Sequence, residues 1–283
     1  MSAPPALFDP ALLAQRRARA DARGAPADFL REIAAAEIAE RLSEVNRRFQ
    51  APVVIGPRGA LFAEAIGLPG ARLLPDAETL DLAEGEADLV VHALALHWAN
   101  DPVGQIAQAR RALRPDGLFI AALFAGDTLW ELRQALAAAE TEILGGLSPR
   151  VAPMGEIRDL GGLLQRAGLA LPVADSARQA VSYQTMFHLI RDLRAMAETN
   201  VLADRTRRPA TRALFARAAE IYAERFDDGV GRVGATFEIV YLTGWAPAPN
   251  QQKPLRPGSA AARLADALGA EEIGAGERAG KPG

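Results

Sequence analysis

The chain has 283 residues, of which 49% are hydrophobic, and a formal net charge of −3 at pH 7. This length and composition are typical of a globular protein with one full core and additions. The small net charge gives no reason to expect nucleic acid or an anionic membrane as partner, the absence of cysteine excludes disulfides and thiolate sites, and no apolar run approaches the length of a transmembrane helix.

The N-terminal part of the chain predicts helices. Two helical stretches are expected, over 9–23 and 28–48, and the second has Phe29, Ile33 and Ile38 on one apolar face. We interpret residues 1–50 as an N-terminal helical cap that covers a sheet or the mouth of a site.

A short strand, 52–55, is followed by the turn Gly56-Pro57-Arg58-Gly59 and a helix over 60–66. Glycines at such a turn let backbone N–H groups approach a ligand, although Pro57 removes one donor. The same GxxG pattern also fits a tight turn that packs the helix against the strand. Arg58 either contacts a ligand carboxylate through its guanidinium fork or lies in solvent, and both alternatives stay open.

One more strand is expected at 71–74, and Asp76 follows it. The spacing from Gly56 to Asp76 is close to the separation at which an acid reaches the ribose hydroxyls in dinucleotide-binding folds. Asp76 is therefore a candidate ligand-binding residue.

The middle of the chain predicts a strand, a helix and a second strand. Residues 88–94 are a buried strand, and Asn100-Asp101-Pro102 caps a helix over 102–113. The turn 114–117, with a glycine able to accept positive φ, then leads into a strand over 118–124. This order is typical of a right-handed unit of a parallel sheet.

Three residues, His92, His97 and Trp98, fall at the carboxyl end of that sheet, where open α/β folds bind ligands. The imidazole of His97 can act as a general base or orient a substrate, whereas Trp98 fits a core aromatic equally well. His92 and His97 could also be two arms of an iron site, but the chain has only three histidines and lacks HxD or HxE spacing. We therefore predict no metal site.

Residues 126–133 begin a helix for which Asp127 or Thr128 is the expected cap. The loop 144–156 is rich in glycine and proline and is predicted to be a lid or substrate loop. Nearby acids either pair with a cationic substrate or serve as cap and surface charges; these are Asp127, Glu131, Glu140 and Glu142.

The C-terminal third predicts further helices and strands. Helices are expected at 157–167, 183–196 and 209–226, and strands at 171–181 and 236–245, with 198–208 as a polar, exposed turn. From residue 247 onward, Pro, Gly, Ala and charged residues predominate, so we expect a largely disordered tail with a short helix near 260–268.

Several of these stretches resemble one family. LHWANDP, LRPDGLFIAALF and GDTLWELR are similar to the middle of class I S-adenosylmethionine-dependent methyltransferases of type 11, particularly the branch of the arginine-hydroxylating assembly factor of respiratory complex I. LRPDG is common to many methyltransferases, whereas GDTLWELR together with LRAMAETN at 193–200 points to this branch. The resemblance spans about residues 7–259, and its other matching stretches are FDP at 8–10, LSPRVAPM at 147–154, DLGGLLQRAG at 159–168 and ATFEIVYLTGW at 235–245.

The resemblance implies an α/β, Rossmann-like class I methyltransferase fold with a shortened parallel sheet, an antiparallel C-terminal strand and a helical cap. Residues 51–246 would form the methyltransferase-like domain, with a helical insertion near 183–226, and 247–283 the tail. Of the family's glycine-rich turn only Gly56 and Gly59 remain, and Val53 or Val54 occupies the acidic position. Between Gly59 and Asp88 there is room for one strand where a complete fold has two strands and a helix.

The resemblance also implies a cofactor, S-adenosyl-L-methionine. It matches 75–77 to the segment that contacts the adenine amino group, which competes with the ribose assignment of Asp76. The expected cofactor-binding residues are Gly56, Arg58, Gly59, Asp76, Ala77 and His92, and the candidate catalytic residues are His97, Trp98 and Asp127.

Three functions follow from these observations. The first is modification of a protein side chain, by resemblance an arginine of a respiratory complex I subunit during assembly. The second is a non-catalytic assembly module with a degenerate cofactor site, and the third is an O-methyltransferase for a small carboxylate or carrier-bound acyl group, for which Arg58 or Arg150 could bind the carboxylate. Because FDP begins at residue 8, there is too little room for a transit peptide, and we expect a cytoplasmic location.

Overall fold

The computed structural model describes residues 6–24, 27–249 and 251. The described residues up to 248 belong to one compact unit. Most of the predicted tail, including the helix expected near 260–268, lies outside the described residues.

A mixed six-stranded sheet organises this unit, in the order β2-β1-β3-β4-β6-β5. Strands β1 to β4 run parallel to one another, whereas β6 is antiparallel to both β4 and β5. The predicted α/β fold with an antiparallel C-terminal strand is confirmed. The strands are β1 (Pro52–Ile55), β2 (Arg72–Leu74), β3 (Ala87–His92), β4 (Leu113–Ala125), β5 (Ala170–Tyr183) and β6 (Val233–Trp245).

The sheet is shortened where the sequence predicted it. Between Gly59 and Asp88 the structure contains the single strand β2, which pairs with β1 and forms the edge of the described sheet. No further strand of the described chain covers that edge.

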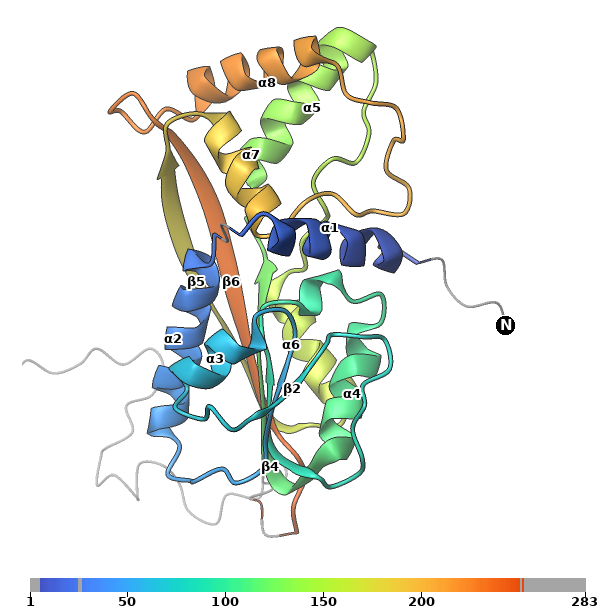
Figure 1. Cartoon of the computed structure of the whole chain (residues 1–283), viewed down its shortest axis with the longest axis vertical. Helices are drawn as coiled ribbons and strands as arrows, with labels where there is room; N and C mark the ends of the chain where they lie inside the picture. The colour runs from blue at the N-terminus through green and yellow to red at the C-terminus, as the bar shows by residue number, and fades with distance from the viewer. Residues whose placement is uncertain (1–5, 25–26, 250, 252–283) are drawn as a thin grey trace, which may run out of the picture. The chain divides into compact units, whose positions relative to one another are not determined.

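Helices cover both faces of the sheet (Figure 1). They are α1 (Pro10–Ala22), α2 (Phe29–Glu44), α3 (Gly59–Ala65), the 3-10 turn η1 (Leu96–Trp98), α4 (Pro102–Ala112), α5 (Trp130–Leu144), α6 (Ile157–Arg166), α7 (Met186–Ala195) and α8 (Arg212–Arg225).

Alternation along the strands divides the apolar side chains into two cores. Val91, Ile120 and Phe237 face the cluster that also contains α2, α5, α7 and α8, whereas Val90 and Phe119 face the cluster that contains α4 and α6. Successive residues of a strand point to opposite faces, so a central strand buried on both faces must be continuously apolar. This explains the uninterrupted hydrophobic runs of β3 and β4.

The helices α5, α7 and α8 lie beyond the carboxyl ends of the parallel strands, with α8 packed on α5 and α1 next to α7 (Figure 1). Tyr222 of α8 anchors this layer, because its buried hydroxyl donates a 2.7 Å hydrogen bond to the carbonyl of Gly234 at the start of β6. The layer therefore stands above the edge of the sheet where ligands of such folds bind.

Two local predictions about helix ends have different outcomes. Asp101 caps α4 as expected, since its carboxylate accepts the backbone N–H of Gly104 at 2.8 Å. The turn predicted at 114–117 is instead part of β4, and Asp116, not the glycine, has the positive φ of 63°. Gly117 is needed for close packing, because a Cβ there would lie 2.9 Å from the Arg114 carbonyl oxygen.

The predicted cap of α5 is wrong. The helix begins after Leu129, which has a left-handed conformation, and neither Asp127 nor Thr128 accepts a capping hydrogen bond there. The Thr128 hydroxyl instead donates to the carbonyls of Ala125 and Glu238, which ties the turn to β6.

None of the helices in the described part of the chain has both the length and the apolar composition needed to cross a bilayer.

Candidate functional site

Two cavities lie at the carboxyl edge of the sheet. One, which we call the apolar pocket, has a volume of about 510 Å³ and is lined by η1, α5, the loop 150–155, α7 and β6. The other, the glycine-loop cleft, has a volume of about 750 Å³ and is lined by α1, the β1–α3 turn and the end of β2. Neighbouring residues of α1 face them, Arg16 the apolar pocket and Arg17 the cleft, so α1 lies between the two.

The apolar pocket brings together stretches that are far apart in the sequence. Its wall contains one or more residues from each of six motifs that carry the family resemblance: Phe8 of FDP, His97 and Trp98 of LHWANDP, Thr128 of GDTLWELR, Arg150 of LSPRVAPM, Glu198 of LRAMAETN, and Phe237 of ATFEIVYLTGW. Asn100 joins two of these motifs, because its side-chain amide exchanges hydrogen bonds with the backbone N–H and carbonyl of Phe8. The motifs therefore enclose one cavity.

A buried carboxylate, Glu198, is the polar centre of this pocket. One of its oxygens lies 3.0 Å from Nε2 of His97 and accepts the indole N–H of Trp98 at 2.8 Å. The backbone N–H of Phe124 points at Nδ1 of His97 at 3.4 Å, which favours the tautomer that carries its proton on Nε2 and donates it to Glu198. His97 and Trp98 thus hold the carboxylate in place.

Its neighbours keep Glu198 ionised. Burial opposes ionisation, but the hydrogen bond from His97 and the guanidinium of Arg31 outweigh it, and the pKa of Glu198 lies below its ordinary value. Arg31 is itself buried; it lies 3.8 Å from the second oxygen of Glu198, donates to the Met196 carbonyl at 2.7 Å and lines the glycine-loop cleft. A single cation therefore connects the two cavities.

Sequence reasoning missed Glu198. The segment 198–208 was predicted to be a polar, exposed turn, whereas the side chain of Glu198 is only 10% exposed. The available signal was its position within LRAMAETN, directly after an amphipathic helix.

In the glycine-loop cleft, close packing explains why residue 56 is a glycine. Gly56 has a φ of 125°, and a Cβ there would lie 2.9 Å from the carbonyl oxygen of Ala93 at the end of β3. Gly59 begins α3, and a Cβ at that position would make only ordinary contacts with Leu73 and Val54. Gly56 is thus required by the close approach of two backbone segments, which is the tight-turn alternative of the sequence reading.

Ion pairs within the protein occupy the polar groups of this cleft. Asp76, whose side chain is 8% exposed, accepts two hydrogen bonds from the guanidinium of Arg17 at 2.6 and 2.9 Å. Arg58 donates to Asp28 at 2.9 Å, and this hydrogen bond raises the pKa of Arg58. Arg58 is therefore paired within the protein and is not simply a solvated side chain.

These contacts do not fit S-adenosyl-L-methionine. A ribose requires a carboxylate that is free to accept its hydroxyls, and Asp76 is engaged by Arg17. The turn has lost one N–H donor at Pro57. The residues of the cleft, as arranged here, do not form a complete cofactor site.

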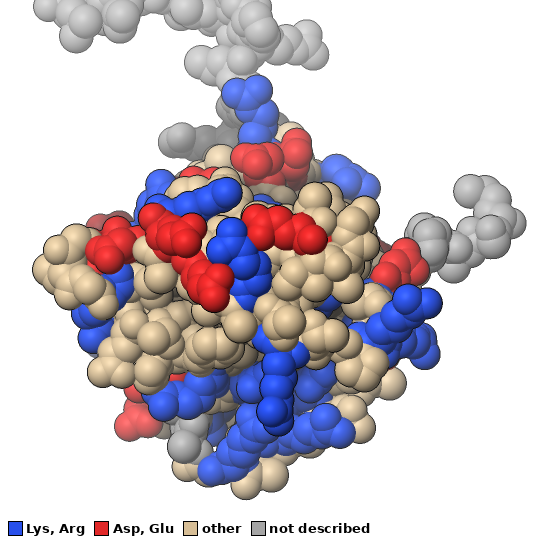
Figure 2. All heavy atoms as spheres, turned by 90° about the horizontal axis from the view of Figure 1, so that it is seen from above, with Lys and Arg blue, Asp and Glu red and all other residues tan. Residues whose placement is uncertain are grey.

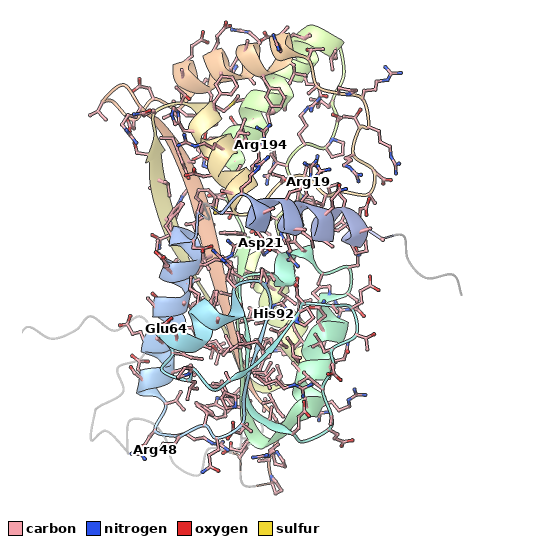
Figure 3. The ribbon with its side chains drawn as sticks, viewed as in Figure 1. Arg19, Asp21, Arg48, Glu64, His92 and Arg194 are labelled. Atoms are coloured by element: carbon pink, nitrogen blue, oxygen red, sulfur yellow. The ribbon has the colours of Figure 1, made fainter. Side chains whose placement is uncertain are left out.

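The remaining predicted cofactor residues lie outside both cavities. His92 is fully buried, with Nε2 3.0 Å from the amide oxygen of Gln105, and burial lowers its pKa; Figure 3 shows it within the body of the sheet. Ala77 accepts a hydrogen bond from Gln105 through its carbonyl. Of the predicted cofactor-binding residues, the structure brings Gly56, Arg58 and Asp76 together and leaves Gly59, Ala77 and His92 apart.

Among the candidate catalytic residues, His97 and Trp98 line the apolar pocket and Asp127 does not. The side chain of Asp127 is 61% exposed and lies 3.3 Å from Arg178 of β5. The other acids of this region are paired internally: Glu131 with Thr236, Glu140 with Arg150 and Ser148, and Glu142 with Arg217. Glu131 and Glu140 are buried, so the interpretation of all four as surface charges is wrong for these two.

In residues 6–24, 27–249 and 251, no group of three or more His, Asp or Glu side chains is arranged to hold a metal ion. His92 and His97 lie in different environments, one against Gln105 and the other against Glu198.

Comparisons with known proteins agree with the motifs. A family model described as a methyltransferase domain matches residues 60–121. The chain is 34% identical over 263 residues to the mitochondrial arginine-hydroxylase NDUFAF5 of Danio rerio, covering 84% of this chain and 82% of the relative. It is 35% identical over 222 residues to the malonyl-[acyl-carrier protein] O-methyltransferase of Laribacter hongkongensis, covering 78% and 70%.

Among solved structures, the phosphoethanolamine N-methyltransferase 2 of Haemonchus contortus in complex with S-adenosyl-L-methionine aligns with a TM-score of 0.41 at 10% identity, covering 75% of this chain and 52% of that one.

The predicted cytoplasmic location is contradicted by these relatives. The NDUFAF5 proteins of fish, human and rat are all named mitochondrial. The early FDP motif, on which the prediction rested, does not decide the compartment.

Proposed function

We propose that this chain modifies an arginine side chain of a respiratory complex I subunit during assembly of that complex. The basis is its family: the chain belongs to the class I methyltransferase superfamily, in the branch of the arginine-hydroxylases NDUFAF5. The relatives are named for hydroxylation. We assign the same substrate class, a protein arginine, to this chain.

The observation that supports this substrate is a carboxylate buried in an apolar pocket. Aliphatic and aromatic walls such as Leu132 and Phe237 suit the methylene groups of an arginine stem. At the polar end, Arg31 at 3.8 Å is the one ion-pair partner of the second oxygen of Glu198 among the described residues. This oxygen retains acceptor capacity for an entering guanidinium, which binds carboxylates through paired N–H donors.

In this proposal His97 and Trp98 are positioning residues. Their N–H groups hold one oxygen of Glu198 and so fix the orientation of the carboxylate in the pocket wall. A guanidinium bound there would be oriented by a fixed carboxylate in surroundings that exclude water, which strengthens electrostatic contacts.

The proposal makes a prediction about protein substrate mass. When a complex I subunit that contains the target arginine is co-expressed with this protein, its intact mass should rise, and peptide mapping should place the change on one arginine. A gain of an oxygen atom identifies hydroxylation, and a gain of a methylene unit identifies methyl transfer. Glu198→Gln should abolish the gain, and Glu142→Gln, which changes an exposed acid far from the pocket lining, should leave it. An unchanged mass with the natural protein would contradict the proposal.

We also propose that the ion pair between Arg17 and Asp76 closes the cofactor site. Methyltransferase domains use S-adenosyl-L-methionine, and this cleft would offer it the carboxylate of Asp76 only after Arg17 moves away. Binding must then break a partly buried bidentate pair, so affinity is reduced.

Arg17→Ala should therefore strengthen binding of S-adenosyl-L-methionine by about tenfold, which corresponds to about 1.4 kcal/mol. This free energy is reasonable for the loss of a partly solvated ion pair. Calorimetric titration of the purified full chain measures this. Arg48→Ala, which removes an exposed arginine far from the cleft (Figure 3), should not change the affinity, and Asp76→Ala should not strengthen it. Equal heats for the natural chain and Arg17→Ala would exclude the ion pair as the closing element.

One observation favours a second function, O-methylation of a carrier-bound carboxylate. Arg16 and Arg194 also line the apolar pocket, and a cationic rim is suited to an acyl carboxylate. The Laribacter relative is named for that reaction. A mass gain on a malonyl carrier protein, with none on the complex I subunit, would decide for this function.

A further inference from the structure

A row of arginines follows one face of α1 beside the mouth of the apolar pocket. Arg16, Arg19 and Arg23 recur at helical spacing, three and four residues apart, and so lie on one side of the helix. Arg194 of α7 faces them, and Arg207 and Arg208 follow in the loop after α7. We call these six residues the arginine groove.

Two small cavities beside the apolar pocket define the groove. A cavity of about 220 Å³ is lined by Arg16, Arg19, Arg23, Arg194 and Thr199. A second, of about 360 Å³, is lined by residues that include Leu12, Arg16, Arg207 and Arg208. Both share Arg16 with the apolar pocket, so the pocket mouth has a basic hollow toward each end of α1.

These arginines have no ion-pair partner within 4.0 Å among the described acids. In the part of the chain that the structure describes, none of the six forms an ion pair with Asp or Glu, whereas the neighbouring Arg205 pairs with Asp9 and Arg150 with Glu140. Nε of Arg16 and the hydroxyl of Thr199 are buried without a hydrogen-bond partner. Burial, together with repulsion from Arg19, Arg205 and Arg194, lowers the pKa of Arg16. An anion would satisfy these groups.

The surface view agrees with this separation of charge. In Figure 2 the basic side chains are all arginines, because both lysines lie outside the described residues; many of them gather in the lower part of the view, whereas most acids lie in the upper part, interspersed with other arginines. Figure 3 shows Arg19 and Arg194 close to each other between α1 and α7.

We infer that the arginine groove binds an acidic polypeptide segment, with carboxylates on both sides of the residue that enters the apolar pocket. This inference rests on the proposed function, in that the polypeptide is the segment around the modified arginine of the protein substrate. It adds a preference of the protein for substrate segments in which acidic residues flank the target arginine.

The dimensions favour a polypeptide over a single phosphate or a membrane. From Leu12 to Arg23 the helix rises about 16 Å at ~1.5 Å per residue, which an extended segment of about five residues spans at ~3.3 Å each. A free phosphate fills only one of the two basic hollows. A bilayer surface is flat and cannot enter concave cavities on both sides of a pocket mouth.

Two fluorescent peptides test the inference by anisotropy with the full chain. One has a central arginine flanked on each side by two glutamates, and the other has glutamines in their place. The glutamate peptide should bind about tenfold more tightly, in line with a few solvent-exposed ion pairs, and the difference should shrink as salt screens the charges.

Matched variants locate the effect. Arg19→Gln with Arg194→Gln, and separately Arg207→Gln with Arg208→Gln, should each remove much of the preference for glutamate. Arg48→Gln with Arg111→Gln removes the same charge at exposed positions outside the groove and should retain the preference. If this control variant also lost the preference for glutamate, the net charge of the protein and not the groove would explain the preference, and the inference would be overturned.

A third peptide separates this inference from the proposed function. It carries norleucine in place of the central arginine between the glutamates. Preferential binding that persists with norleucine supports the groove even where arginine modification fails. Equal binding of the glutamate and glutamine peptides overturns the groove, and so does full displacement of the glutamate peptide by equimolar inorganic phosphate. Groove-dependent capture of the protein by phosphatidylglycerol vesicles without any peptide binding would identify a membrane site instead.

Discussion

Glu198→Leu is expected to lower the free energy of unfolding by about 2–5 kcal/mol, because buried donors left without an acceptor each cost about 1–3 kcal/mol and the loss of one partner of a buried charge pair costs still more. The donors are the indole N–H of Trp98 and Nε2 of His97, and Arg31 loses its neighbouring anion. Chemical denaturation of the natural chain and the variant measures the difference. Arginine modification should be lost in the same variant.

An exposed acid provides the matched control. Glu142 pairs with Arg217 at the surface, so Glu142→Leu should change stability far less than Glu198→Leu, because solvent screens an exposed ion pair. If both variants lost the same stability, the hydrogen bonds around Glu198 would not be the cause.

The isosteric change Glu198→Gln tests the charge separately. The pKa of Glu198 is lowered in the folded protein, so the unfolded chain takes up the proton at higher pH than the folded one. The stabilisation by the carboxylate is therefore complete above its ordinary value of 4.5 and is lost as the pH falls through the lower folded value. The advantage of the natural chain over the variant should be constant near neutral pH and decrease in acid. An advantage that grew in acid would contradict the assigned direction.

Arg31→Met should lower the free energy of unfolding by about 3 kcal/mol, the lower part of the range for breaking a buried charge pair. The side chain of Arg31 is 6% exposed. Methionine fills a similar volume but leaves the Met196 carbonyl without its donor, and it removes the cation from Asp28 and Glu198. Because Arg31 connects the cleft to the apolar pocket, the variant should also weaken arginine modification.

Arg72→Met is the matched control for this prediction. Arg72 also contacts two acids, Asp81 and Glu86, but its side chain is 43% exposed, and solvent screens those pairs to about 0–1 kcal/mol. In a double-mutant cycle, Arg31→Met and Glu198→Leu together should cost less than the sum of the single changes, since both remove the same contact. Strict additivity would show that Arg31 acts on stability without Glu198.

Local patterns in the sequence determined the order and type of the elements. Continuous apolar runs predicted β3 and β4, because only a strand buried on both faces needs them, and Asp101-Pro102 predicted the start of α4. Such short-range signals depend on residues a few positions apart, so they can be read without the fold. The shortened sheet was implied only by comparison of the segment after Gly59 with the pattern of the family that the chain resembles.

Only the tertiary structure decided which charged groups are free. Asp76 was predicted to meet a ligand, but α1, which lies 59 residues away in the sequence, supplies Arg17 to it. Glu198 was predicted to lie in an exposed turn, but η1, 100 residues away, surrounds it with His97 and Trp98. Burial and pairing of a charge are set by residues distant in the chain, and a single sequence does not contain that information.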